Sequence, residues 1–129
     1  MATEPMIHTY ILDLPFPPSV NSIWRKVGNK MVISAPYHAW KIDANRLGLA
    51  QRINKNPMMV GPFEADILLD SAKFGKIDVD NPSKAVLDWT QKMMLVENDK
   101  NCRRLLIEWG DTSHGCKLTL RGRITLSTS

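Results

Sequence analysis

Apolar and polar residues alternate along this chain with two different periods, one typical of strands and one typical of helices. Over residues 7–13, Ile7, Thr9 and Ile11 fall on one face of a predicted first strand. After a proline-rich break, residues 23–26 and 31–34 flank Gly28 and Asn29, which predicts a short hairpin. Further strands are predicted over 63–70, 105–109 and 117–126, with a hairpin loop over 110–115.

Two segments show helical spacing instead. The first helix is predicted to begin after Ser34 or Ala35, with Pro36 in its first turn, and to end by residues 54–57. Its apolar stripe consists of Tyr37, Trp40, Ala44 and Leu47. The second helix is predicted from Asn81-Pro82, with a stripe of Val86, Trp89, Met93 and Val96. The pattern therefore predicts a single α+β domain over residues 1–129, with a small mixed sheet and two main helices.

Charge is unevenly distributed along the chain. The protein has 17 Lys and Arg against 13 Asp and Glu, a formal net charge of +4. Residues 70–99 depart from this balance, because they hold six acids and four basic residues. An acidic site in a basic protein favours a metal-dependent enzyme that acts on a polyanion.

Cysteine usage and hydropathy predict where the chain is found. Cys102 and Cys116 form no CxxC motif, so we expect free thiols in a reducing compartment. No signal peptide and no stretch long enough to span a bilayer are expected, so the chain is predicted to be soluble and intracellular.

The acidic segment contains a candidate metal site. Asp78 and Asp80 leave the same face if the backbone there is extended, and Asp99 follows the predicted helix that Asp80 precedes. Three carboxylates without His or Cys favour Mg²⁺ or Mn²⁺. Lys84 lies four residues from both Asp80 and Asp88, so the three share a helix face. The alternative is that these are solvated acids and a surface ion pair, and Asp88 either orients Lys84 or is an ordinary exposed acid.

Two segments together resemble the RusA family of Holliday-junction resolvases, the endodeoxyribonucleases of phages and prophages. They are the proline-rich turn 14–25, which contains Asn21, and the D-x-D-N-x-x-K segment 78–88 followed by 95–99. The resemblance implies that Asp78, Asp80 and Asp99 bind metal and that Lys84 is catalytic. Two further residues, Asn21 and Asp88, match supporting positions. Where the family often pairs its downstream acids, this chain has Asn98, which leaves Asp99 as the expected ligand and Glu97 as the alternative. Just before the D-x-D the family is often arginine-rich, whereas this chain has Lys73, Lys76 and Ile77 there.

The resemblance also implies the partners. The substrate would be branched, four-way DNA, cut by paired symmetric hydrolysis in the cytoplasm of a bacterial or phage-infected cell. A two-fold homodimer is expected because a junction has two equivalent strands to cut, and no membrane is involved. Candidate phosphate contacts are Arg25, Lys26, Lys30, Lys73, Lys76, Arg103 and Arg104.

Three alternative functions stand beside the resolvase. They are a nucleic-acid-binding protein of the same fold without cleavage activity, a Mg²⁺-dependent nucleotide phosphohydrolase, and a metal-free interaction module.

Overall fold

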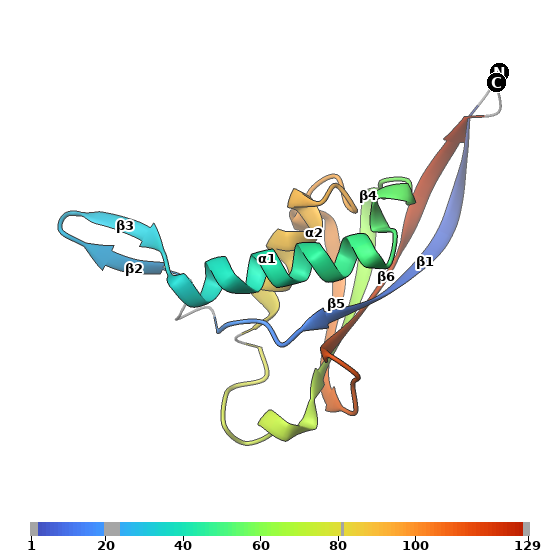
Figure 1. Cartoon of the computed structure of the whole chain (residues 1–129). Helices are drawn as coiled ribbons and strands as arrows, with labels where there is room; N and C mark the ends of the chain where they lie inside the picture. The colour runs from blue at the N-terminus through green and yellow to red at the C-terminus, as the bar shows by residue number, and fades with distance from the viewer. Residues whose placement is uncertain (1–2, 20–23, 81, 128–129) are drawn as a thin grey trace.

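A four-stranded mixed sheet, covered on one face by two helices, forms the body of the molecule (Figure 1). The computed structural model describes residues 3–19, 24–80 and 82–127. The strands are β1 (Thr3–Pro15), β2 (Trp24–Val27), β3 (Lys30–Ile33), β4 (Val60–Asp70), β5 (Cys102–Gly110) and β6 (Gly115–Ser127). The helices are α1 (Ala35–Ala50) and α2 (Ser83–Lys92), with single 3₁₀ turns η2 (Ile53–Lys55), η3 (Ser71–Lys73) and η4 (Asp99–Asn101). The predicted α+β class and mixed sheet are confirmed.

The sheet order is β1-β6-β4-β5, and this order corrects one prediction. β6 is antiparallel to both β1 and β4, whereas β5 is parallel to β4, with α2 in the connection between these two strands. Residues 110–115 are therefore not a hairpin loop, because they carry the chain past the end of β4. There the Thr112 hydroxyl donates to Asp70 Oδ2 at 2.9 Å. Hydrophobic periodicity alone does not distinguish a hairpin from a connection that skips one strand.

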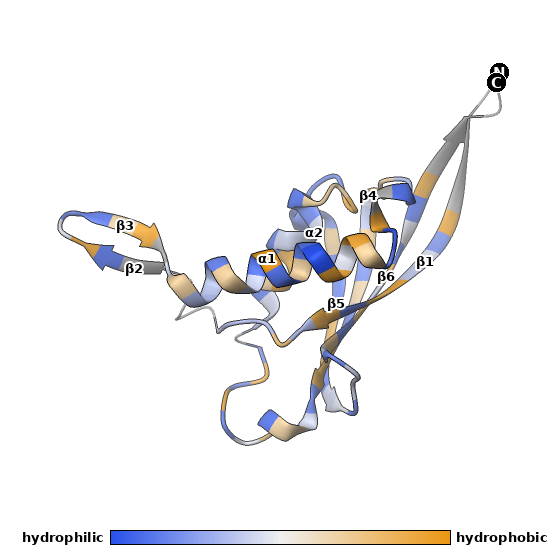
Figure 2. Ribbon diagram, in the orientation of Figure 1, coloured by the Kyte–Doolittle hydropathy of each residue, from blue (hydrophilic) through white to orange (hydrophobic). Residues whose placement is uncertain are grey.

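Hydrophobic and polar residues alternate along the strands, as the colours in Figure 2 show, and their burial divides the sheet into a covered face and an open one. The covered face buries one set of strand residues under the helices, among them Leu12, Leu14, Ile67, Leu69, Leu118 and Leu120. Ile7 and Ile11 share a face as predicted, but it is the open one, where their exposed fractions are 69% and 62%. The sheet thus has one apolar face packed on helices and one mixed face in contact with solvent.

Helix α1 begins where the sequence predicted. Ser34 is its N-cap, and the Ser34 hydroxyl accepts a hydrogen bond from the Tyr37 N–H at 3.3 Å. Tyr37, Trp40 and Ala44 are buried as expected, but the fourth buried position is Gly48 rather than Leu47. At Gly48 the helix packs against α2, so closely that a Cβ there would lie 3.0 Å from the Trp89 ring.

Helix α2 is shorter than its apolar stripe suggested. It ends at Lys92, and Met94 adopts a left-handed backbone with φ of 60°. The predicted stripe is correct for Val86 and Trp89, but Val96 lies beyond the helix. Val96 is nevertheless buried, and its backbone forms an isolated bridge with the buried Met59. This early end to α2 turns the chain back toward the helix, and the turn places Asp99.

The β2–β3 hairpin projects away from the body (Figure 1). Its register pairs Val27 with Lys30, and Gly28 supplies the positive φ of 62° that the predicted turn requires. Within the described ranges, no helix is long and apolar enough to cross a membrane.

Candidate active site

One face of α2 carries the polar side chains of the acidic segment. Lys84 Nζ lies 3.5 Å from Asp88 Oδ2, as their spacing of four residues predicted. Gln91 lies one turn further along the same face. The opposite side of the helix buries Val86 and Trp89, and this packing fixes which way the polar face points.

Asp99 reaches this face through the turn η4. The Asn98 side chain accepts a hydrogen bond from the Lys100 N–H at 2.9 Å, which closes the turn. The Asp99 N–H donates to Gln91 Oε1 at 2.8 Å, which ties the turn to α2.

The carboxylates of Asp88 and Asp99 consequently lie close together. Burial raises the pKa of Asp88, and the Asp99 carboxyl, within hydrogen-bonding range, raises it further, while the Lys84 ammonium acts in the opposite direction. The structure therefore brings Lys84, Asp88 and Asp99 into one cluster.

Asp78 and Asp80 occupy a different position, in the exposed turn before α2. The backbone bends at residues 79–80 and is not extended, so the argument that placed both side chains on one face does not apply. The Asp80 carbonyl accepts hydrogen bonds from the Ser83 N–H and hydroxyl, at 3.3 and 2.8 Å. Asp88 lies five residues into α2, roughly 7.5 Å along the helix axis from Ser83, whereas Asp80 lies before the helix begins.

The expected triad of Asp78, Asp80 and Asp99 is therefore divided between two places, with Lys84 between them. Nowhere in residues 3–19, 24–80 and 82–127 do three acidic, His or Cys side chains group closely enough to hold one metal ion.

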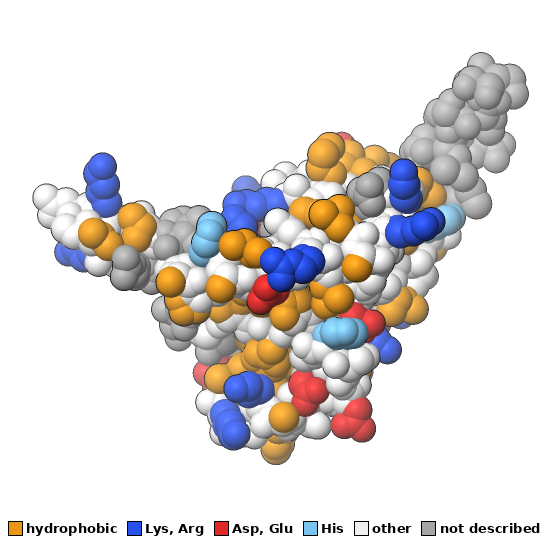
Figure 3. Space-filling view, in the orientation of Figure 1, with side chains coloured by type: hydrophobic (Ala, Val, Ile, Leu, Met, Phe, Trp, Pro, Cys, Tyr) orange, Lys and Arg blue, Asp and Glu red, His pale blue; other side chains and the backbone are white. Residues whose placement is uncertain are grey.

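The remaining candidates lie around this cluster or far from it. Asn21 lies outside the described residues, as does the side chain of Arg25. Lys26 and Lys30 are exposed on the hairpin, and Lys73 and Lys76 are exposed on and after η3. Glu97, the alternative ligand, is exposed. On the face shown in Figure 3, basic side chains are spread from the hairpin across α1 and do not form one compact patch.

Arg103 and Arg104 lie on β5, where acids already face them. Arg103 Nε is 4.0 Å from Glu64 Oε2, and Arg104 Nη1 is 3.2 Å from Asp66 Oδ1. These two contacts are on the open face of the sheet.

The cluster contains Gln91, which the sequence pattern did not predict, and Asp88, for which the family resemblance implies a supporting role. The spacing of Lys84, Asp88 and Gln91 at i, i+4 and i+7 is the signal that could have found them, because it places all three on one helix face. The contact of Gln91 with Asp99 depends on the end of α2 at Lys92, which the sequence did not predict.

Comparison with known families gives the class of the protein. A family model described as Endodeoxyribonuclease RusA matches residues 15–121, so the protein is an endonuclease that acts on DNA. Because the match covers most of the chain, the chain belongs to the RusA family of Holliday-junction resolvases. No curated protein matches the chain. The enzyme class predicted from the two sequence motifs is confirmed.

Proposed function

We propose that this chain is a Mg²⁺-dependent resolvase that makes paired symmetric cuts in four-way DNA, with Asp78, Asp80, Lys84 and Asp99 as its catalytic residues. The observation that supports this assignment best is the cluster of Lys84, Asp88 and Asp99, formed by the acidic segment of an otherwise basic chain. The family match supplies the DNA substrate, and the cluster supplies a place for the chemistry.

The donor chemistry of the site fits a hard divalent cation. The candidate ligands Asp78, Asp80 and Asp99 are all carboxylates. Asp99 also lies beside the Asp88 carboxyl, whose pKa is raised first by burial and then by Asp99, and a cation would offset the cost of holding these two acids together. Asp78, Asp80 and Asp99 would hold Mg²⁺ or Mn²⁺, and the ion would supply an activated water and neutralise charge on the scissile phosphate. Because Asp78 and Asp80 lie on an exposed turn, sharing an ion with Asp99 requires this turn to approach the cluster.

The protein's own side chains have separate tasks in this proposal. The Lys84 ammonium stabilises the charge that develops on the phosphate or on the leaving 3′ oxygen. Asp88 holds Lys84 in place through their ion pair. Gln91 is a positioning residue, because its hydrogen bond fixes the backbone of Asp99.

A homodimer in the bacterial cytoplasm is the assembly that we infer. A four-way junction presents two equivalent strands, and two sites related by a two-fold axis can cut both in one complex. The net charge of +4 favours association with the polyanionic junction.

Isosteric variants test the catalytic assignment. Asp80→Asn and Asp99→Asn should each abolish nicking of a synthetic four-way junction in Mg²⁺ and leave junction binding in EDTA intact or tighter, because a charge that repels phosphate is removed. Asp43→Asn is the matched control, since Asp43 is an exposed acid on α1, 3.9 Å from Arg46. Undiminished nicking by both site variants would contradict the assignment, and equal cutting of linear duplex would contradict the junction preference.

A further inference from the structure

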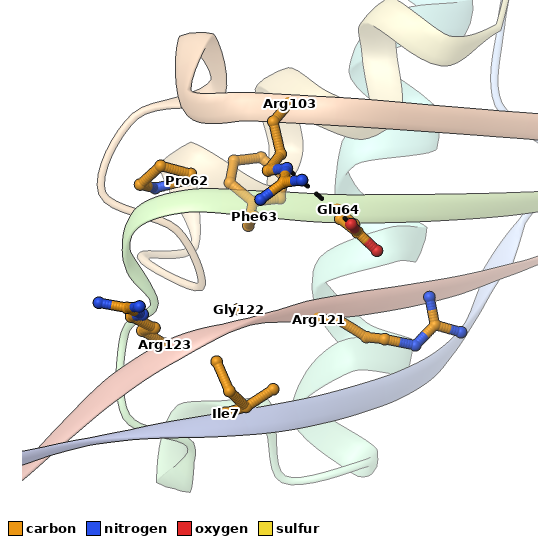
Figure 4. Close-up of a pocket in the computed structure, with 8 residues that line it drawn as sticks. All are labelled: Ile7, Pro62, Phe63, Glu64, Arg103, Arg121, Gly122 and Arg123. Carbon is orange, nitrogen blue, oxygen red and sulfur yellow. Dashed lines mark ion pairs between the residues drawn. The ribbon is translucent and has the colours of Figure 1, made fainter.

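A hollow of about 430 Å³ opens on the uncovered face of the sheet, where β4 lies between β5 and β6 (Figure 4). Its walls carry the arginines Arg103, Arg121 and Arg123 and one acid, Glu64. Phe63 and Gly122 form part of its floor, and Phe63 is only 1% exposed. The hollow is thus a basic surface depression that offers no accessible aromatic ring at its base.

Two irregularities in strand pairing build this hollow. Between β4 and β5, Phe63 pairs with Cys102 and Glu64 with Arg104, so Arg103 has no partner. A bulged residue changes the direction of the side chains around it. Consecutive residues Arg103 and Arg104 therefore both reach acids of the open face, although side chains of a regular strand alternate between faces.

The second irregularity lies on the other side of β4. Val60 pairs with Arg123 and Phe63 with Gly122, which leaves Gly61 and Pro62 unpaired. Gly61 has a φ of 70°, which a residue with a side chain adopts only at a cost. The extra residues spread β4 away from β6 at the point where the hollow opens.

Positive charge is in excess around the hollow. Asp66 accepts from both Arg104 and Arg121, each at 3.2 Å, so its charge is shared between two guanidinium groups. Glu64 is 4.0 Å from Arg103, a loose contact. Arg123 is exposed and has no ion pair with any side chain that the structure describes. Four arginines thus face two acids, a local net charge of +2.

We propose that this hollow binds the phosphodiester backbone of one arm of the substrate DNA. Planar guanidinium groups match phosphate oxygens in geometry and charge, and they are the side chains that most often do so. Because Phe63 is buried, the hollow holds the backbone and does not stack a base, so it positions the DNA without reading sequence.

The position of the hollow links it to the cluster on α2. The turn η4 runs directly into β5, so Asp99 is followed four residues later by Arg103. Asp99 and Glu64 both raise the pKa of Cys102, the first residue of β5, after the larger effect of its burial. DNA engaged at the cluster could therefore continue over the start of β5 to the open face. This inference rests on the DNA substrate, not on the assignment of the metal ligands.

A salt titration tests the proposal. The double variant Arg103→Gln/Arg123→Gln should bind an immobile four-way junction in EDTA about 5- to 10-fold more weakly at low salt. The slope of log K against log salt should become less negative by about 0.9 for each phosphate that the variant no longer neutralises. The single variant Arg123→Lys keeps the positive charge, so its slope of log K against log salt should stay close to that of the unmodified protein.

Matched measurements separate the possible outcomes. Arg46→Gln on α1 removes an exposed arginine elsewhere and should leave both Kd and slope unchanged. The proposal is overturned if the double variant behaves like Arg46→Gln. It is also overturned if the variant changes the sedimentation mass but not the DNA affinity, since the face would then be a protein contact. The nicking activity of Asp80→Asn and Asp99→Asn has no influence on this titration, so the two proposals fail independently.

Discussion

At the scale of single residues, side-chain caps determine the turns on both sides of α2. Asp70 caps η3 by accepting the Ala72 N–H at 2.9 Å, and the Thr112 hydroxyl donates to the same carboxylate. After the helix, Asn98 closes η4 in the same way. Asp and Asn are favoured in such turns because their short side chains reach backbone N–H groups two residues ahead. These caps hold the two ends of the acidic segment.

The Asp70 cap predicts a specific dependence of stability on pH. The Ala72 N–H, followed by the Thr112 hydroxyl, lowers the pKa of Asp70 from its ordinary value of 3.8. Folding therefore favours the ionised form, so its stabilising effect is complete above the unfolded pKa and is lost as pH falls through the folded pKa. Asp70→Asn should lower the urea midpoint at about pH 6 and have little effect at about pH 2.5. Asp43→Asn serves as control, and a deficit of Asp70→Asn that persists in acid would contradict the cap as its cause.

At the scale of elements, sequence patterns predicted which segments form helices and strands better than they predicted how these segments meet. Ser34, Pro36 and the stripe from Tyr37 are local signals, and α1 begins accordingly. The end of α2 depends on the positive φ of Met94, which the local sequence did not predict. The prediction of a hairpin loop over 110–115 was wrong because strand order is set by long-range pairing.

The candidate site shows the same division between local and long-range information. The ion pair of Lys84 and Asp88 follows from helical spacing, and it was predicted. The proximity of Asp99 to Asp88 follows from the return of the chain after α2, which spacing only made possible. The arginine hollow depends on two bulges that the alternating pattern does not reveal.

Packing of α1 on α2 predicts an unusual effect of a helix-favouring substitution. Alanine normally stabilises a helix by about 1 kcal/mol relative to glycine. In Gly48→Ala, however, the new Cβ would lie 2.8 Å from Ile53 Cδ1 and 3.0 Å from the Trp89 ring. That ring cannot easily move, because Trp89 Nε1 donates to Asn45 Oδ1 at 2.9 Å. Overpacking costs about 1–3 kcal/mol, so we expect a net loss of about 1 kcal/mol in urea denaturation.

The exposed position Ala39 on the same helix supplies the control. Ala39→Gly should cost about 1 kcal/mol through helix propensity alone. If Gly48→Ala stabilises the protein by a similar amount, the close approach of the two helices is not as tight as the structure indicates.

At the scale of the whole molecule, the sheet separates the two faces to which we assign functions. The acidic cluster lies on the side of the helices, the arginine hollow lies on the open side, and the start of β5 connects them.

The sheet also keeps the two cysteines apart. Cys102 pairs with Phe63 near the beginning of β4, and Cys116 pairs with Leu69 near its end. Six residues of strand separate these positions, roughly 20 Å.

The reactivity of the two thiols should differ because Cys102 and Cys116 differ in burial. Burial raises the pKa of the Cys116 thiol to about 12, and burial is also the main cause of the raised pKa of Cys102. In the native protein at neutral pH, Cys102, which is half-buried, should react slowly with a thiol reagent, and Cys116 should react only after denaturant is added. Mild oxidation should give no intramolecular disulfide, as nonreducing peptide mapping would show. Rapid labelling of Cys116 in the native state would mean that the sheet opens readily.

The pairing of β1 with β6 joins residues from opposite ends of the chain, such as Thr3 with Ser127. Every pair in this ribbon closes a loop of about 100 residues or more, and such long-range pairing slows folding. During synthesis, β1 leaves the ribosome before β6 and stays unpaired until β6 has been translated. The exposed edge of β1 is then open to association with other chains. The newly made resolvase should therefore complete its sheet only after β6 has been translated, and it should depend on chaperones until then.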